Sequence, residues 1–179
     1  LNAKVNYELG EKDKIYLSGY FGRDLFYFKE KYANEGDDYV FKTNFGWGNA
    51  TGTFRWNHVM GPKLFVNTSL IYSTYDLEIK AKEEENDTTQ FELKYGSGIR
   101  DYTLKQDYDW YVNTRNKVKF GFQVTDHKFT PSAVVVLGDL DSDNLNKKTI
   151  YQGVETGLYV EDEIKFTSKF KGLLGLRLS

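Results

Sequence analysis

Three aspartates stand at alternate positions of the segment DLDSDN, namely Asp139, Asp141 and Asp143. They have the spacing of positions 1, 3 and 5 of a calcium-binding loop, in which carboxylates ligate the ion. Such a loop also has glycine at position 6 and glutamate at position 12, where this chain has Asn144 and Ile150. The pattern favours a solvated acidic loop, and calcium binding by the three aspartates is left open.

Two histidines, His58 and His127, are the other residues that could ligate a metal or serve as a base. A zinc site or a nucleophilic triad needs further Cys, His or acidic partners at suitable spacing. The chain has no cysteine, and the two histidines fall in segments far apart in the sequence. Each is therefore interpreted as a lumen or interface residue.

Carboxylates are concentrated near the C-terminal end, at Glu155, Glu161, Asp162 and Glu163. Paired carboxylates can act as acid and base, but on a strand residues 161 and 163 are simply neighbours along one face. Pairing with arginines such as Arg55 or Arg177 is the simpler interpretation. The sequence therefore predicts no enzyme: we assign no catalytic residue, no cofactor-binding residue, no metal ligand and no cofactor.

The composition favours β-structure. Of the 179 residues 17% are aromatic, two are proline, and the mean hydropathy is −0.60. The net charge of −2 provides no basic field for nucleic acid, so no nucleic-acid partner is expected. No apolar run approaches the roughly 18 residues of a membrane helix, but a membrane-crossing strand needs only about 10 residues of alternating polarity.

Alternation with a period of two recurs along the chain, most cleanly where Val118, Phe120, Phe122 and Val124 alternate with polar residues. We expect eight antiparallel strands of about ten residues or more. Their approximate ranges are 1–9, 15–22, 49–57, 64–73, 92–110, 118–125, 154–161 and 170–178.

The connections between these strands are expected to alternate in length. Short turns are predicted at 10–13, 60–63, 112–116 and 167–169, and long loops at 23–46, 79–91 and 130–149, with both prolines in connections. The role of the three long loops is left open, as is whether the run AVVVL within the last of them forms a short extra strand or a flap. All short turns then fall at one end of the sheet.

The two faces of the predicted sheet differ in chemistry. Phe120, Phe122, Leu158 and Leu174 share the apolar face, while Arg55 and Glu161 lie on a polar face that also includes aromatic residues. Lipid outside and a wet lumen inside would account for this contrast. Aromatic residues that could form a girdle at the membrane interface gather near the short turns: Tyr7, Trp56, Phe65, Tyr108, Trp110, Phe166 and Phe170.

Three stretches, namely FGWGNATGTFRWNHVMGPKLFVNTSLIYSTYD, SGIRDYTLKQDYDWYVNTRNKVKFG and LYVEDEIKFTSKFKGLLGLRLS, resemble the barrel of TonB-dependent receptors of the Bacteroidota type. The resemblance covers the strands and short turns better than the long loops. It implies an outer-membrane transporter barrel of about 22 strands, plugged by an N-terminal domain, that takes up a scarce ligand. Residues 1–179 would then be a single barrel segment of about eight strands, without plug domain or signal peptide.

The resemblance also implies partners and a location: the lipid bilayer of a Gram-negative outer membrane, the remainder of the barrel and the plug, and an energy-coupling protein or a surface lipoprotein. The ligand and the oligomeric state are left open. Two alternatives are a complete eight-stranded outer-membrane barrel with a structural or adhesion role, and a soluble barrel whose apolar faces line a ligand pocket.

Overall fold

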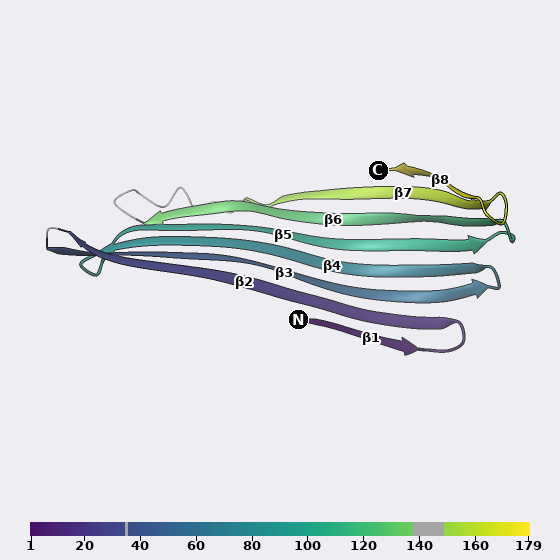
Figure 1. The fold of residues 1–179 in the computed structure, drawn as a ribbon, viewed down its shortest axis with the longest axis horizontal. Helices are drawn as coiled ribbons and strands as arrows, with labels where there is room; N and C mark the ends of the chain where they lie inside the picture. The colour runs from purple at the N-terminus through teal and green to yellow at the C-terminus, as the bar shows by residue number, and fades with distance from the viewer. Residues whose placement is uncertain (35, 138–148) are drawn as a thin grey trace.

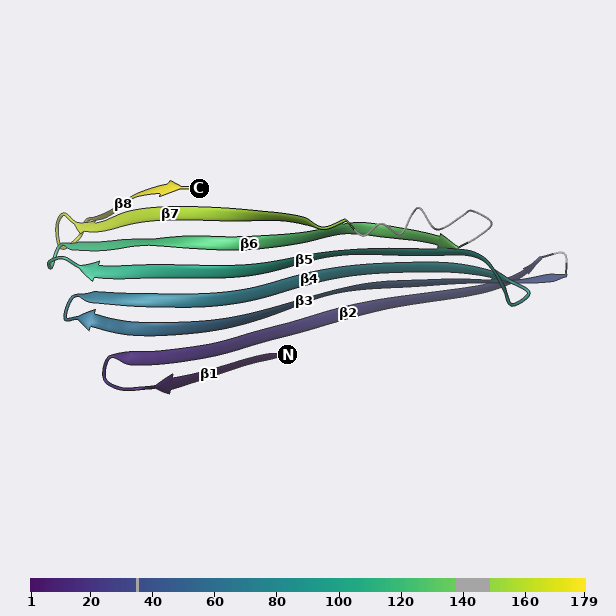
Figure 2. The same cartoon turned by 180° about the vertical axis from the view of Figure 1, so that it is seen from behind.

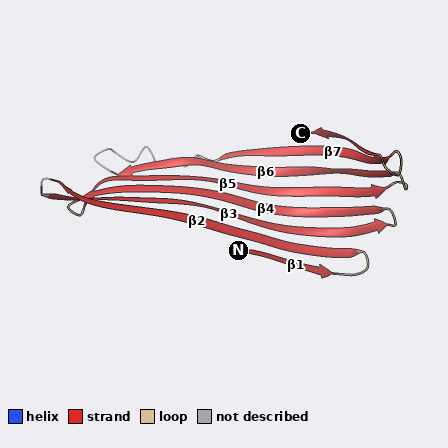
Figure 3. Cartoon of the chain, in the orientation of Figure 1, coloured by secondary structure: helices blue, strands red, loops and turns tan. Residues whose placement is uncertain are grey.

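The computed structural model describes residues 1–34, 36–137 and 149–179, and within these ranges the regular structure is entirely β (Figure 3). The strands are β1 Asn2–Glu8, β2 Asp13–Asn34, β3 Asp37–Gly61, β4 Leu64–Glu85, β5 Thr88–Tyr111, β6 Asn116–Leu137, β7 Tyr151–Lys165 and β8 Lys171–Leu178. The described residues contain no helix long and apolar enough to cross a membrane. The all-β prediction is confirmed.

All eight strands belong to one antiparallel sheet in which each strand pairs with its neighbours in the sequence, from β1 at one edge to β8 at the other. This up-and-down order is the predicted one. Figures 1 and 2 show the two chain termini at opposite edges of this single layer. In the described part of the chain β1 and β8 do not pair, so the sheet is open rather than a closed eight-stranded barrel.

The long loops predicted at 23–46 and 79–91 are wrong. β2 and β3 instead pair continuously from Asp13 opposite His58 to Asn34 opposite Asp37, and β4 and β5 pair up to Glu85 opposite Thr88. Strands of 22 to 25 residues result. The period-two pattern failed in these segments because, as shown below, the apolar side of the sheet changes along each strand.

The third predicted loop, 130–149, is wrong in its first part. The run AVVVL continues β6, where Ala133 lies opposite Gly96 and Leu137 opposite Glu92. Pro131 therefore lies inside a strand, at a register shift between Gly96 and Gly98 where the ladder skips it, as a residue without an N–H requires. The acidic segment with Asp139, Asp141 and Asp143 lies outside the described residues.

Tight turns close the hairpins at both ends of the sheet. Asn86 and Asp87 join β4 to β5 with positive φ angles of 46° and 62°. This is the conformation of a two-residue hairpin turn, and Asn and Asp tolerate it better than other side chains do. At the opposite end, the Asn113 carboxamide oxygen accepts hydrogen bonds from the backbone N–H groups of Arg115 and Asn116, at 2.8 and 2.9 Å. We call the end with the turns at 9–12, 62–63, 112–115 and 166–170 the turn end, and the other the distal end.

The sheet has no second layer over it, so among the described residues the only buried hydrophobic side chain is Val66. Large apolar side chains such as Leu70, Leu158 and Leu174 remain 52, 58 and 66% exposed. A soluble barrel around an apolar pocket would enclose these side chains. Within the described residues these side chains are not enclosed, and the eight strands do not form a closed barrel.

Candidate functional site: the two faces of the sheet

Near the turn end, one face of the sheet, which we call face 1, is mostly apolar, with Thr68 and Gln106 as polar members of its inner rows. One row of cross-strand pairs on it joins five strands: Leu17 to Phe54, Phe54 to Leu70, Leu70 to Leu104 and Leu104 to Val124. The surface extends from Trp110 to Tyr102 on β5, nine residues. That is the length of a strand that crosses a hydrocarbon layer at a tilt.

Aromatic residues border this apolar band on both sides. Trp110 and Tyr108 lie at the turn end of face 1, while Tyr72 and Tyr102 pack with ring centroids 5.1 Å apart at its other border. Phe65 departs from the prediction: it pairs with Asp109 on the opposite face and contacts Tyr111 edge-on, with centroids 5.7 Å apart. A band between two membrane interfaces requires an aromatic row at each border, as found here. Phe65 is not a member of either row.

The opposite face, face 2, is polar over the same stretch. Lys119 lies 3.5 Å from Glu161, and Lys117 lies 3.0 Å from Asp109. An open hollow of about 420 Å³ on this face is lined by charged side chains. They include Arg55, Lys105, Asp107, Glu161 and Arg177. Arg55, Glu161 and Arg177 line this hollow together, but within the described residues the predicted pairing with arginine is not found. Glu161 pairs with Lys119 instead, and Arg55 donates a hydrogen bond to the Ser69 hydroxyl at 3.4 Å.

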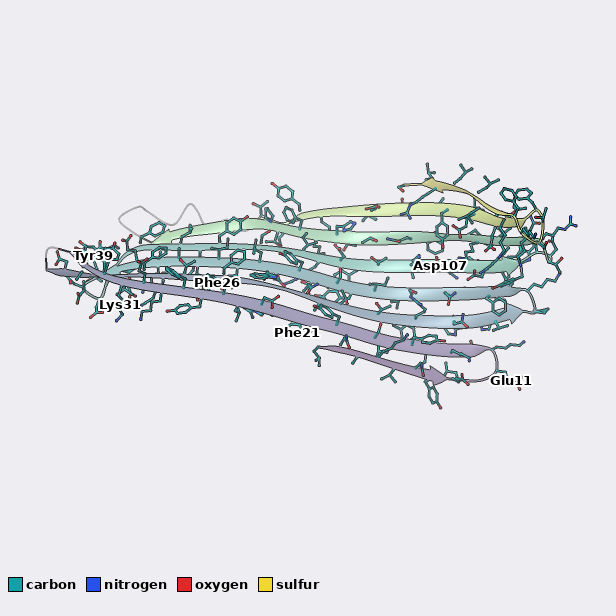
Figure 4. The ribbon with its side chains drawn as sticks, viewed as in Figure 1. Glu11, Phe21, Phe26, Lys31, Tyr39 and Asp107 are labelled. Carbon is teal, nitrogen blue, oxygen red and sulfur yellow. The ribbon has the colours of Figure 1, made fainter. Side chains whose placement is uncertain are left out.

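Glycines on face 2 allow long polar side chains to lie flat across the neighbouring strand. The Tyr159 hydroxyl crosses Gly121 to donate a hydrogen bond to Asp107, two strands away. A Cβ atom on Gly121 would stand 2.8 Å from that hydroxyl oxygen. Arg177 crosses Gly157 in the same way, with Nη2 at 3.1 Å from the position of such an atom. Figure 4 shows Asp107 in the turn-end half of the sheet.

The two histidines are far from each other and differ in surroundings. His58 contacts Asp13 at 2.7 Å on face 1, beside the turn end. His127 lies on face 2 with Asp101 at 2.8 Å and Glu155 at 3.5 Å. Within the described ranges no group of three His, Cys, Asp or Glu side chains is arranged to hold a metal ion. Both histidines take part in pairwise polar contacts.

Beyond the Tyr72–Tyr102 row, towards the distal end, the two faces exchange character. On face 1, the first row beyond Tyr72 contains Phe21, Ala50 and Thr74. The next row contains the charged residues Arg23 and Asp76. Face 2 becomes aromatic and aliphatic, and we call its surface on β2–β5 the distal wall. Its members are Phe26, Phe28, Glu30, Tyr32, Tyr39, Phe41, Phe45, Trp47, Leu77, Ile79, Glu83, Glu85, Phe91, Leu93 and Tyr95. Apolar side chains also remain on face 1, among them Leu25, Tyr27 and Val40.

Side-chain contacts confirm that the distal wall is one surface. The rings of Tyr32 and Tyr39 stack with centroids 5.1 Å apart and planes at 8°. The Tyr32 hydroxyl donates to Glu83 at 3.3 Å and the Tyr39 hydroxyl to Glu85 at 3.0 Å. Desolvation and the Glu83 carboxylate raise the pKa of Tyr32, and the hydrogen bond to Glu85 with desolvation raises that of Tyr39. Both hydroxyls therefore stay protonated, as donors.

Face 1 at the same level has charged pairs of the kind that face water. Glu84 accepts hydrogen bonds from Lys42 at 2.5 Å and from Lys82 at 2.6 Å, and these lower the pKa of Glu84 to about 2. Lys94 pairs with Glu92 at 2.8 Å. In Figure 4, Phe26, Lys31 and Tyr39 mark the distal half of the sheet. The sequence did not predict the distal wall because most of its side chains fall within 23–46 and 79–91, which were expected to be loops.

Comparison with known proteins bears on the fold. Family models and curated proteins give no match to the chain. Among solved structures, the chain is similar to the ferric yersiniabactin uptake receptor FyuA from Yersinia pestis, with a TM-score of 0.67 and 7% sequence identity, over 98% of this chain and 26% of that one. The chain thus spans about a quarter of the length of FyuA. At this identity the likeness concerns the fold: eight up-and-down strands arranged as in part of the barrel of a TonB-dependent receptor.

Proposed function

We propose that residues 1–179 form part of the barrel wall of an outer-membrane receptor that transports a scarce ligand in a TonB-dependent manner. The observation that carries the proposal is the apolar band on face 1, nine residues long between aromatic rows, over which the described residues place no second layer. Soluble proteins do not leave such a surface in water. The fold likeness to FyuA supports the same reading.

In this proposal face 1 contacts lipid and face 2 lines the lumen. The charged surface around Asp107, Lys119 and Glu161 then meets the plug domain, and the distal half of β2–β6 stands outside the membrane, where it surrounds the entrance. The remainder of the barrel, a plug and an energy-coupling protein are the proposed partners. The likeness to FyuA supports a receptor of this kind in general, and the Bacteroidota type stays a prediction from the sequence.

Single cysteines test the orientation of the wall, since residues 1–179 contain none and any cysteine elsewhere in the full-length gene product is replaced by serine. In the full-length gene product in intact vesicles, we expect Leu70→Cys, Leu104→Cys and Leu158→Cys, all on face 1, to resist a water-soluble maleimide. Lys94→Cys, on face 1 beyond the band, should react readily. Equal reaction of Leu104→Cys and Lys94→Cys would contradict the proposed membrane position.

Transport is tested without knowing the ligand. Culture medium is analysed by mass spectrometry after growth of cells with and without the full-length gene product. We expect at least one medium component to be depleted only by cells that make the protein, and the depletion to stop when a protonophore dissipates the inner-membrane gradient. A depletion that the protonophore leaves unchanged would argue for a passive pore instead.

A further inference from the structure

The distal wall exposes large aromatic side chains on the face that would enclose the entrance. Phe26, Phe28 and Tyr32 are 59, 44 and 48% exposed. A wall in contact with water and ions alone would not need exposed aromatic side chains, which lower the solubility of a protein. A surface of this kind therefore marks a place where another molecule binds. The question is the chemistry of that molecule.

Charge on the distal half is sorted between the two faces. Every lysine and arginine in 22–34, 37–49, 74–85 and 88–100 lies on face 1. These residues are Arg23, Lys29, Lys31, Lys42, Lys80, Lys82, Lys94 and Arg100. Over the same ranges face 2 carries acidic side chains, among them Asp24, Glu30, Glu83 and Glu85, and no basic one.

This sorting determines what the aromatic surface can attract. The face of an aromatic ring attracts a cation, even at an exposed site. Each carboxylate within a few ångströms attracts a cation further and repels an anion. Because Glu83 and Glu85 stand beside the stacked pair Tyr32 and Tyr39, the aromatic and the acidic contributions act at the same place.

We propose that the distal wall binds a low-molecular-weight cation with an apolar or aromatic body, and that it discriminates against anions of the same shape. The rings take the apolar body, and Glu30, Glu83 and Glu85 take the positive charge. The basic residues of face 1 point away from this site and do not oppose the cation. This inference rests on the proposed function, since it requires face 2 to line the entrance.

Two water-soluble probes with the same aromatic body test the charge preference: a naphthyl trimethylammonium cation and naphthalene sulfonate. Their dissociation constants for the detergent-solubilised full-length gene product are measured by equilibrium dialysis and saturation-transfer NMR. We expect the cation to bind at least about tenfold more tightly at 50 mM salt, a difference of about 1.4 kcal/mol. The preference should shrink at 500 mM salt, because Glu30 is exposed and Glu83 and Glu85 are only partly buried, so that salt screens all three charges.

Matched variants locate the preference. Glu30→Gln/Glu83→Gln/Glu85→Gln removes three charges from face 2 and should reduce the preference to less than about threefold. Asp76→Asn/Glu78→Gln/Glu92→Gln removes three charges from face 1 of the same region and should leave it unchanged. Phe26→Ala/Phe28→Ala should weaken both probes. Retention of the heat-dependent shift in gel mobility verifies that each variant is folded.

The proposal is overturned if the sulfonate binds as tightly as the cation, if neither probe binds at millimolar concentration, or if the two triple variants change the preference equally. These outcomes are separable from failure of the proposed function, because the cysteine-labelling pattern of the wall involves no ligand. If the cysteine-labelling pattern is the expected one but the cation is not preferred, the proposed receptor function stands and only the proposed ligand chemistry is rejected.

Discussion

At the scale of single residues, Gly121 is the position on which the charged surface of face 2 depends most directly. The Tyr159 side chain crosses it to reach Asp107. We expect Gly121→Ala to lower the free energy of unfolding by about 1–3 kcal/mol, because the methyl group enters space that Tyr159 and the Gln106 backbone occupy. Urea unfolding in lipid vesicles measures this. In a Tyr159→Ala background the same substitution should cost less, and an identical cost would show that the two residues are not coupled.

Glu84 is the residue whose ionisation the structure perturbs most clearly outside the apolar band. Hydrogen bonds from Lys42 and Lys82 lower its pKa to about 2. Because the pKa of Glu84 is lower in the folded than in the unfolded chain, its ionised form stabilises the folded hairpin at pH values above the usual pKa of 4.5. This contribution decreases below pH 4.5 and is lost as the pH falls through about 2. NMR titration of the carboxyl should find the midpoint near 2, and Lys82→Met should move it up. A midpoint unaffected by Lys82→Met would exclude the contact with Lys82 as a cause of the lowered pKa and leave only the one with Lys42.

At the scale of elements, the sequence predicts the turn-end half of the sheet well and the distal half poorly. Segments such as 118–125 alternate cleanly because one face is apolar along their whole length, and the order and pairing of all eight strands follow from them. In β2 the apolar positions are odd up to Phe21, whereas Phe26, Phe28 and Tyr32 are at even positions, and Leu25 and Tyr27 interrupt the change. A single count of alternation across this change finds no period, so the segment resembles a loop.

The same change of side explains what was missed in the candidate site. The polar residues of face 2 near the turn end, including Arg55 and Glu161, could be placed from the sequence because they oppose an apolar face. The distal wall could not, since its aromatic residues share their segments with many charges. Counting the alternation of apolar and polar residues separately in each half of a long strand would place Phe26, Phe28 and Phe45 on one face.

The β2–β3 hairpin permits a test at this scale. Leu25 pairs with Gly46, so replacing residues 26–45 by an Asn-Gly turn keeps the register of both strands. We expect the shortened protein to fold into membranes, because the apolar band is untouched, and to lose binding of the naphthyl cation. Heat-dependent gel mobility and equilibrium dialysis measure the two properties. Failure to insert would mean that the distal hairpin is needed for folding as well as for binding.

For the whole molecule, the height of the apolar band determines which membrane it matches. Eight steps from Tyr102 to Trp110 at about 3.3 Å each give about 26 Å along the strand, or about 20 Å when tilted by about 40°. We expect the full-length gene product to have a higher Tm in bilayers with twelve-carbon acyl chains than in those with eighteen-carbon chains. Thermal unfolding in the two kinds of vesicle tests this, and a higher Tm in the thicker bilayer would contradict the band assigned to face 1.

The exchange of character between Phe21 and Phe26 on β2 has a consequence for how this gene can change. Inserting or deleting one codon between the two halves of such a strand would rotate every side chain beyond it to the wrong side, placing lysines inward and phenylalanines in water. Inserting or deleting two codons would return every side chain to its original face. Length variation at this level of the sheet, in natural relatives or in a library under selection, should therefore occur in even numbers of residues.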